Sequence, residues 1–128
     1  MISSQSVPKS GEGSGAWLLK ILTGLLVIVI LGIHFVVNHT LGGMAGLLTY
    51  TEIVSYYARN PIIPIMEGLF VIFVVTHALL GLRSIILDMK PSTKALKVIN
   101  WVFVIGGAAF IIYGLGLIIT IVMRGLQV

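Results

Sequence analysis

The sequence predicts an all-α integral membrane protein with three transmembrane helices. Of its 128 residues, 58% are hydrophobic and only 9% are charged, and a soluble domain of this size could not bury so much apolar surface in one core. A spanning helix needs about 20 mostly apolar residues, and three stretches of the chain are long enough. No alternating pattern typical of a β-barrel is visible, so we expect helices to satisfy the backbone hydrogen bonds within the lipid.

The first elements along the chain are a polar tail and one spanning helix. Residues 1–15 contain Ser, Gly and Lys but no apolar run, which predicts a short cytoplasmic tail and no signal peptide. The first spanning helix is expected at about 16–38. The segment from Gly42 to Asn60 then contains three tyrosines, which are typical of the interface between membrane and water.

Two further helices complete a membrane domain at 16–125. The second is expected at about 62–88, because Pro61 and Pro64 are tolerated at a helix start and Pro91 follows its end. The third is expected at about 95–123, and the chain has no charged residue between Lys97 and Arg124.

The basic residues predict the orientation in the membrane. Three helices put the two termini on opposite sides, and cytoplasmic segments have more Lys and Arg. Six basic residues fall on the side of the N-terminus and two on the other: Lys9, Lys20, Arg83, Lys90, Lys94 and Lys97 against Arg59 and Arg124. We therefore expect a cytoplasmic N-terminus, and the net charge of +4 does not indicate nucleic-acid binding.

The composition also restricts the chemistry. The chain has no cysteine, which excludes iron–sulfur clusters held by its own thiolates, zinc bound through sulfur, and internal disulfides. Any redox centre must be held by other side chains.

All three histidines lie in or near the predicted spanning helices. Ionisable groups are costly in lipid and usually functional, although an imidazole that only hydrogen-bonds a neighbouring helix is the alternative. His34 and His39 are five residues apart, about 140° on an α-helix. We therefore expect them to face different partners and only one of them to be a ligand.

One face of the second helix combines His77 with Asp88. Eleven residues correspond to three turns plus about 20°, and Gly81 lies one turn from His77 on the same side. A glycine there leaves room for a flat group such as haem, although small-residue helix packing would also explain it. Asp88 opposes the helix dipole, so it is either a solvated acid or a polar group at the mouth of a quinone site.

Each of two basic residues, Arg83 and Lys20, has two possible roles from the sequence. Arg83 could bind a haem propionate or mark the inner membrane edge. Lys20 lies near the face of His34, where it could extend its amine to the membrane edge or contact a ligand.

The segments IHFVVNH at 33–39 and HALLGLRSIILD at 77–88, together with the three-helix plan, resemble the cytochrome b membrane anchor subunits of succinate:quinone oxidoreductases, also called succinate dehydrogenase or complex II. The resemblance covers about residues 16–125. In that family the second helix carries an axial haem b histidine, a glycine, a basic residue and an acid eleven places after the histidine. These positions map to His77, Gly81, Arg83 and Asp88.

The resemblance implies two haems b with His77 and His34, rather than His39, as axial ligands of the iron. It implies that Arg83, His39 and Lys20 each contact either a haem propionate or a side chain that binds the haem. Quinone binding is implied for Asp88 and Ser84.

The resemblance further implies partner proteins. A three-helix chain would be half of a larger helical bundle, completed by a second three-helix membrane subunit that supplies the opposite haem ligands. An iron–sulfur subunit and a flavoprotein subunit would lie on the cytoplasmic side of a prokaryotic cell membrane. The C-type and D-type anchors both stay open.

The expected function is therefore electron transfer from succinate, oxidised on another subunit, to quinone near Asp88. Three alternatives remain from the sequence: the haem b anchor of another membrane dehydrogenase, a non-redox scaffold or transporter subunit, and a single haem clamped between His34 and His77 of one chain.

Overall fold

The computed structural model describes residues 13–41 and 49–127. The order of elements is α1 (Ser14–Phe35), η1 (Val36–Leu41), α2 (Tyr50–Arg59), α3 (Ile62–Asp88) and α4 (Thr93–Gly125). Three helices, α1, α3 and α4, are long and apolar enough to cross a membrane. The predicted all-α class with three spanning helices is therefore confirmed. Most of the predicted tail, including Lys9, and part of the loop after the first helix lie outside the described residues.

The helix bounds follow from local chemistry. α3 has the predicted bounds, whereas α4 begins two residues earlier, at Thr93, because the Ser92 hydroxyl accepts a hydrogen bond from the Ala95 amide at 3.2 Å. α3 ends where Lys90 adopts a left-handed φ of 52°, directly before Pro91. The left-handed conformation of Lys90 reverses the chain between α3 and α4.

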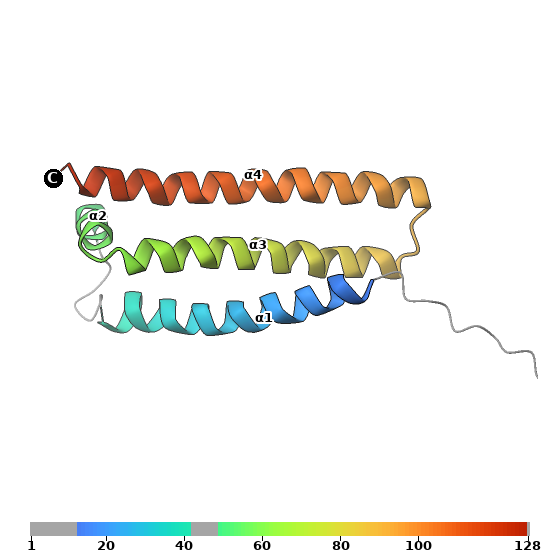
Figure 1. Cartoon of the computed structure of the whole chain (residues 1–128), viewed down its shortest axis with the longest axis horizontal. Helices are drawn as coiled ribbons and strands as arrows, with labels where there is room; N and C mark the ends of the chain where they lie inside the picture. The colour runs from blue at the N-terminus through green and yellow to red at the C-terminus, as the bar shows by residue number, and fades with distance from the viewer. Residues whose placement is uncertain (1–12, 42–48, 128) are drawn as a thin grey trace, which may run out of the picture.

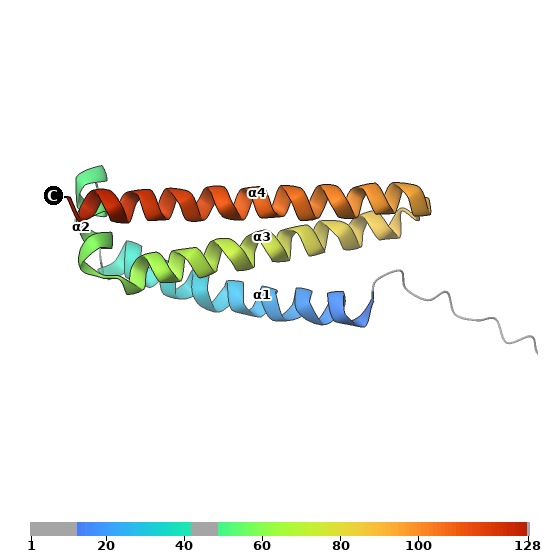
Figure 2. The ribbon, with the colours of Figure 1, turned by 45° about the horizontal axis from the view of Figure 1, so that its top comes forward.

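The three long helices lie side by side in one layer, with α3 between α1 and α4 (Figures 1 and 2). The short helix α2 lies across the end of the layer where α4 ends, and it packs against α4. Gly125 of α4 approaches the backbone of Val54 so closely that a side chain there would clash. We call this end the α2 end, and the opposite end, with the turn between α3 and α4, the basic end.

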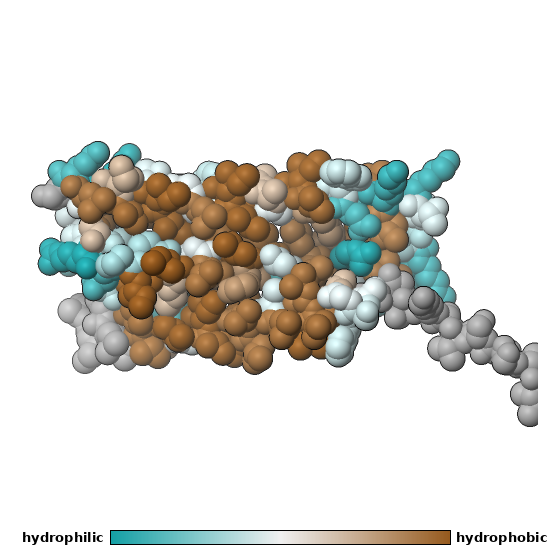
Figure 3. Space-filling view, viewed as in Figure 1, coloured by the Kyte–Doolittle hydropathy of each residue, from teal (hydrophilic) through white to brown (hydrophobic). Residues whose placement is uncertain are grey.

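The surface of the layer is mostly apolar. Among the described residues, only Val54 and Ile63 are buried hydrophobic residues, while the middle of the molecule is a hydrophobic band between two polar ends (Figure 3). A soluble protein could not expose this band. The chain is thus a multi-pass membrane protein whose apolar faces contact lipid or partner helices.

Candidate functional site

The imidazole of His77 lies between α3 and α1. Its Nδ1 atom is 3.0 Å from the backbone carbonyl oxygen of Lys20 and 3.5 Å from the hydroxyl of Thr23, which is only 3% exposed. A carbonyl oxygen only accepts hydrogen bonds, so Nδ1 carries the proton and donates. In the neutral ring, Nε2 then carries the lone pair that can bind a metal.

The imidazole of His77 can lie this close to α1 because residue 24 is a glycine. A Cβ atom on residue 24 would lie 2.8 Å from Cε1 and 3.1 Å from Nδ1 of His77, both closer than normal packing allows. The sequence interpretation assigned no such role to Gly24. A glycine one helical turn beyond Lys20 was the available signal.

The second nitrogen of the imidazole, Nε2, makes no hydrogen bond within the part of the chain that the structure describes. No buried side-chain nitrogen or oxygen there lacks a partner. Nε2 is therefore not completely buried, although it lies close to α1, since a Cβ on Gly24 would be 3.6 Å from it. A Cβ on Gly81 would meet nothing within 4 Å, so packing against another helix of the described chain does not explain this glycine.

Polar residues continue along the same face toward the basic end. The Lys20 amine donates to the Ser84 hydroxyl at 2.7 Å, and that hydroxyl donates to the Leu80 carbonyl at 3.1 Å. Asp88, the last residue of α3, is exposed one turn further on. The structure therefore brings together Lys20 and Ser84, which the sequence had placed in separate roles.

Arg83 lies on a different side of α3. Its Nε atom donates to the side-chain oxygen of Asn100 in α4 at 2.8 Å, and both residues line a groove between α3 and α4 with Leu79 and Gly107. Six residues separate Arg83 from His77, about 120° around an α-helix. Asn100 was missed by the sequence interpretation, because an asparagine near the start of a predicted helix has many ordinary explanations.

His34 is held at the α2 end by a residue that the sequence interpretation missed. The imidazole Nδ1 is 2.7 Å from the carboxylate of Glu67 in α3, and the ring stacks on Phe70 with 5.7 Å between centroids and 19° between planes. Glu67 follows the two prolines at the start of the predicted second helix. Its acidic side chain within an apolar run was the signal.

The expected separation of His34 and His39 is wrong. Their ring centroids lie 6.1 Å apart in an edge-to-face arrangement, because residues 36–41 form a π-helix in place of the expected α-helical turn. A π-helix bonds residues five apart, which brings side chains at that spacing together. The two imidazoles therefore share one region instead of facing different partners.

His34 and His77 are far apart along the layer. The partner of His34, Glu67, lies ten residues before His77 in α3, which is about 15 Å at the helical rise per residue. Axial ligands of one haem have only the iron between them. The alternative of a single haem held between these two histidines of one chain would require their side chains to bridge this separation.

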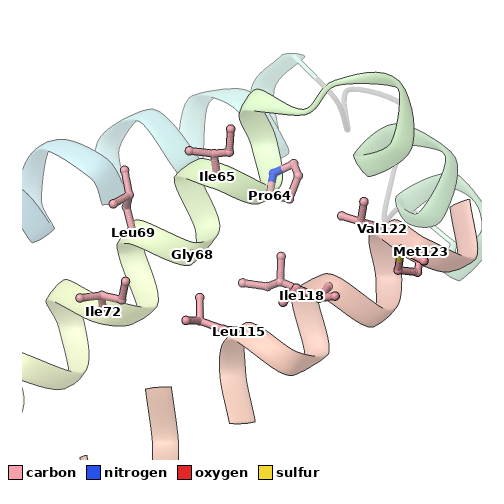
Figure 4. Close-up of a pocket in the computed structure, with 10 residues that line it drawn as sticks. Pro64, Ile65, Gly68, Leu69, Ile72, Leu115, Ile118, Val122 and Met123 are labelled. Atoms are coloured by element: carbon pink, nitrogen blue, oxygen red, sulfur yellow. The ribbon is translucent and has the colours of Figure 1, made fainter. Parts of the chain in front are cut away.

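A second groove between α3 and α4 lies toward the α2 end and is apolar (Figure 4). It has a volume of about 410 Å³, and its lining includes Pro64, Leu69, Ile118 and Val122. No side chain that lines it is polar, so it offers no hydrogen bond to orient a quinone ring.

Comparison with known proteins shows the family of this chain. A model of the succinate dehydrogenase/fumarate reductase transmembrane subunit family matches residues 4–116. The chain belongs to this family. It is also 32% identical over 106 residues to the succinate dehydrogenase hydrophobic membrane anchor subunit of Archaeoglobus fulgidus, a match that covers 83% of this chain and 88% of the relative. No solved structure matches the chain significantly.

Membership of the family agrees with the open helix layer. Within the part of the chain that the structure describes, no three His, Cys, Asp or Glu side chains gather as a metal site. In this member of the succinate dehydrogenase/fumarate reductase transmembrane subunit family, the imidazoles of His77 and His34 each have Nδ1 hydrogen-bonded to an oxygen atom.

Proposed function

We propose that this chain is the haem b-binding membrane anchor subunit of a succinate:quinone oxidoreductase. The observation that carries the proposal is the state of His77, whose Nδ1 donates to the Lys20 carbonyl while Nε2 has no hydrogen-bond partner among the described residues. Metal-bound histidines almost always donate their second N–H to such an acceptor, which fixes the tautomer and the ring plane. The family match supports the same function.

The donor set fits haem iron. His77 and His34 would each hold one haem b, because both imidazoles have Nδ1 occupied by an oxygen atom and they lie at different depths. Haem bound at these positions supplies one-electron transfer across the membrane. This chain contributes the tautomer, the ring orientation and the apolar surroundings. Each opposite ligand would come from the second membrane subunit.

The quinone site is proposed at the basic end, beside Lys20, Ser84 and Asp88. The Lys20 amine donates to the Ser84 hydroxyl and has further protons that it can donate to a quinone oxygen. The Ser84 hydroxyl could donate to quinone only by turning its single proton away from the Leu80 carbonyl. Asp88 is exposed at the end of α3, where a carboxylate can exchange protons with water. His77, Gly81, Ser84 and Asp88 recur at helical spacing, so this site and the haem at His77 would share one face of α3.

Two residues keep secondary roles. Arg83 could bind a haem propionate only from the α4 side, because its guanidinium contacts Asn100. His39 is exposed beside His34 and is proposed to contact the haem that His34 holds.

The exposed apolar helix faces and the lysines at the basic end support the proposed partners. The exposed apolar faces of α1 and α4 suit a second three-helix subunit that completes the bundle. An iron–sulfur subunit and a flavoprotein subunit with the succinate site would dock at the basic end, on the cytoplasmic side of a prokaryotic cell membrane. Lys90, Lys94 and Lys97 lie at that end, as the positive-inside rule requires.

A difference spectrum tests the proposal. The complex purified from membranes should show a b-type haem band after reduction with succinate, and it should reduce quinone. Asp88→Asn should lower quinone reduction while succinate oxidation with a soluble acceptor continues. A haem band without succinate activity would favour the anchor of another dehydrogenase, and a complex without b-type haem would favour a non-redox scaffold.

A further inference from the structure

Glu67 of α3 forms a short polar contact with His34 near the α2 end. The Glu67 side chain is 12% exposed, the His34 side chain is 25% exposed, and the Oε1 to Nδ1 distance is 2.7 Å. Taking a carboxylate out of water is costly unless it is paired and hydrogen-bonded. The contact with His34 offsets that cost. It therefore favours the register in which His34 of α1 lies beside Glu67 of α3.

The geometry determines which nitrogen of His34 can bind a metal. An ionised carboxylate only accepts hydrogen bonds, so Nδ1 of His34 carries the proton and Nε2 of the neutral ring carries the lone pair. Phe70 lies one turn after Glu67 on α3 and stacks on the imidazole at 19°. One helix therefore fixes both the rotation of the ring, through Glu67, and its plane, through Phe70.

The two proposed haem ligands differ in the charge of their acceptors. Nδ1 of His77 donates to a neutral backbone carbonyl, whereas Nδ1 of His34 donates to a carboxylate. A hydrogen bond to an anion is stronger and draws the proton further from the ring. The ring then donates more electron density through Nε2.

We propose that Glu67 is a positioning residue that orients His34 and makes it a more electron-donating ligand of haem iron than His77. The inference rests on the proposed haem-binding function. The negative charge of Glu67 stabilises the ferric state of a haem bound by His34 more than the ferrous state, because the ferric centre carries one more positive charge. Glu67 therefore lowers the midpoint potential of that haem.

Two variants of the full complex separate charge from shape. Glu67→Gln keeps an oxygen acceptor of similar size without the charge, so we expect the haem of His34 to remain bound with a more positive midpoint potential. Glu67→Leu removes the acceptor, so we expect loss of the haem that His34→Ala also removes. Thr120→Val is the matched control, because among the described residues the Thr120 hydroxyl bonds only to the Gly116 carbonyl of its own helix.

The readouts are the redox titration and low-spin haem spectrum of each complex, at equal amounts of assembled complex per membrane. A shift in Glu67→Gln that affects one haem and is absent in Thr120→Val supports the inference. Unchanged potentials and spectra in both Glu67 variants, in a complex that binds haem at His34, overturn it and leave the proposed function intact. A wild-type complex without b-type haem overturns both.

Discussion

The His77 imidazole is bonded to the backbone of Lys20, whereas the Lys20 side chain is bonded elsewhere. Nδ1 of His77 donates to the Lys20 carbonyl at 3.0 Å, and the Lys20 amine donates to Ser84 at 2.7 Å. One residue of α1 thus contacts the proposed haem ligand through its main chain and the proposed quinone site through its side chain. These two contacts can be separated by mutation.

The first prediction concerns the Lys20 side chain. Lys20→Met should leave the haem content unchanged, because the carbonyl oxygen remains. It should raise the KM for quinone about tenfold, since a hydrogen bond from a charged donor contributes about 1.5 kcal/mol. Haem absorbance and quinone kinetics of the purified complex check both parts. Haem loss in Lys20→Met would show that the side chain holds the haem instead.

A second prediction concerns the contact between Gly24 and His77. Gly24→Ala should displace the imidazole, because the new Cβ would lie 2.8 Å from Cε1. We expect a cost of about 1–3 kcal/mol from overpacking and reduced haem occupancy at His77. Gly32→Ala, in the same helix, is the matched control, because its Cβ would meet nothing within 4 Å. Equal haem content in the two variants would argue against this packing.

The spanning helices could be predicted from the sequence because lipid restricts the backbone to a few solutions. The apolar length of the segment predicts a spanning helix, and Pro61 and Pro91 on either side mark its limits at 62–88. The stripe from His77 to Asp88 was also visible, since it depends only on the period of an α-helix.

The remaining features of the candidate site could be identified only from contacts between residues in three dimensions. The π-helix at 36–41 changes the relation of His34 to His39, and the sequence has no simple signal for such a change in helical period. Glu67 and Asn100 gain meaning only from the residues opposite them, His34 and Arg83. Pairing across helices depends on rotation and register, which the separate helix patterns do not determine.

A third prediction concerns Tyr57 of α2, outside the spanning helices. Burial, followed by the negative charge of Glu67 and by Tyr56, raises the pKa of Tyr57 to about 12 from an ordinary value of 10.0. Its phenol should stay protonated in the folded protein between these values, while the unfolded chain ionises. The contribution of Tyr57 to stability is therefore complete below pH 10 and is lost as the pH rises through about 12.

Tyrosinate absorbance measures this pKa. The difference between the titration curves of the wild-type complex and Tyr57→Phe isolates the phenol, and Glu67→Gln should lower its pKa. A Tyr57 that titrates as an ordinary tyrosine in the folded complex would contradict its burial and its position near Glu67.

The central claim is that this chain supplies one axial ligand to each of two haems b, through His77 and His34. The most direct test is the number of haems b per assembled complex in the wild type, His77→Ala and His34→Ala. We expect two haems in the wild type and one in each variant, with a different haem lost in each. A wild-type complex without b-type haem, or full haem content in His77→Ala, would contradict it.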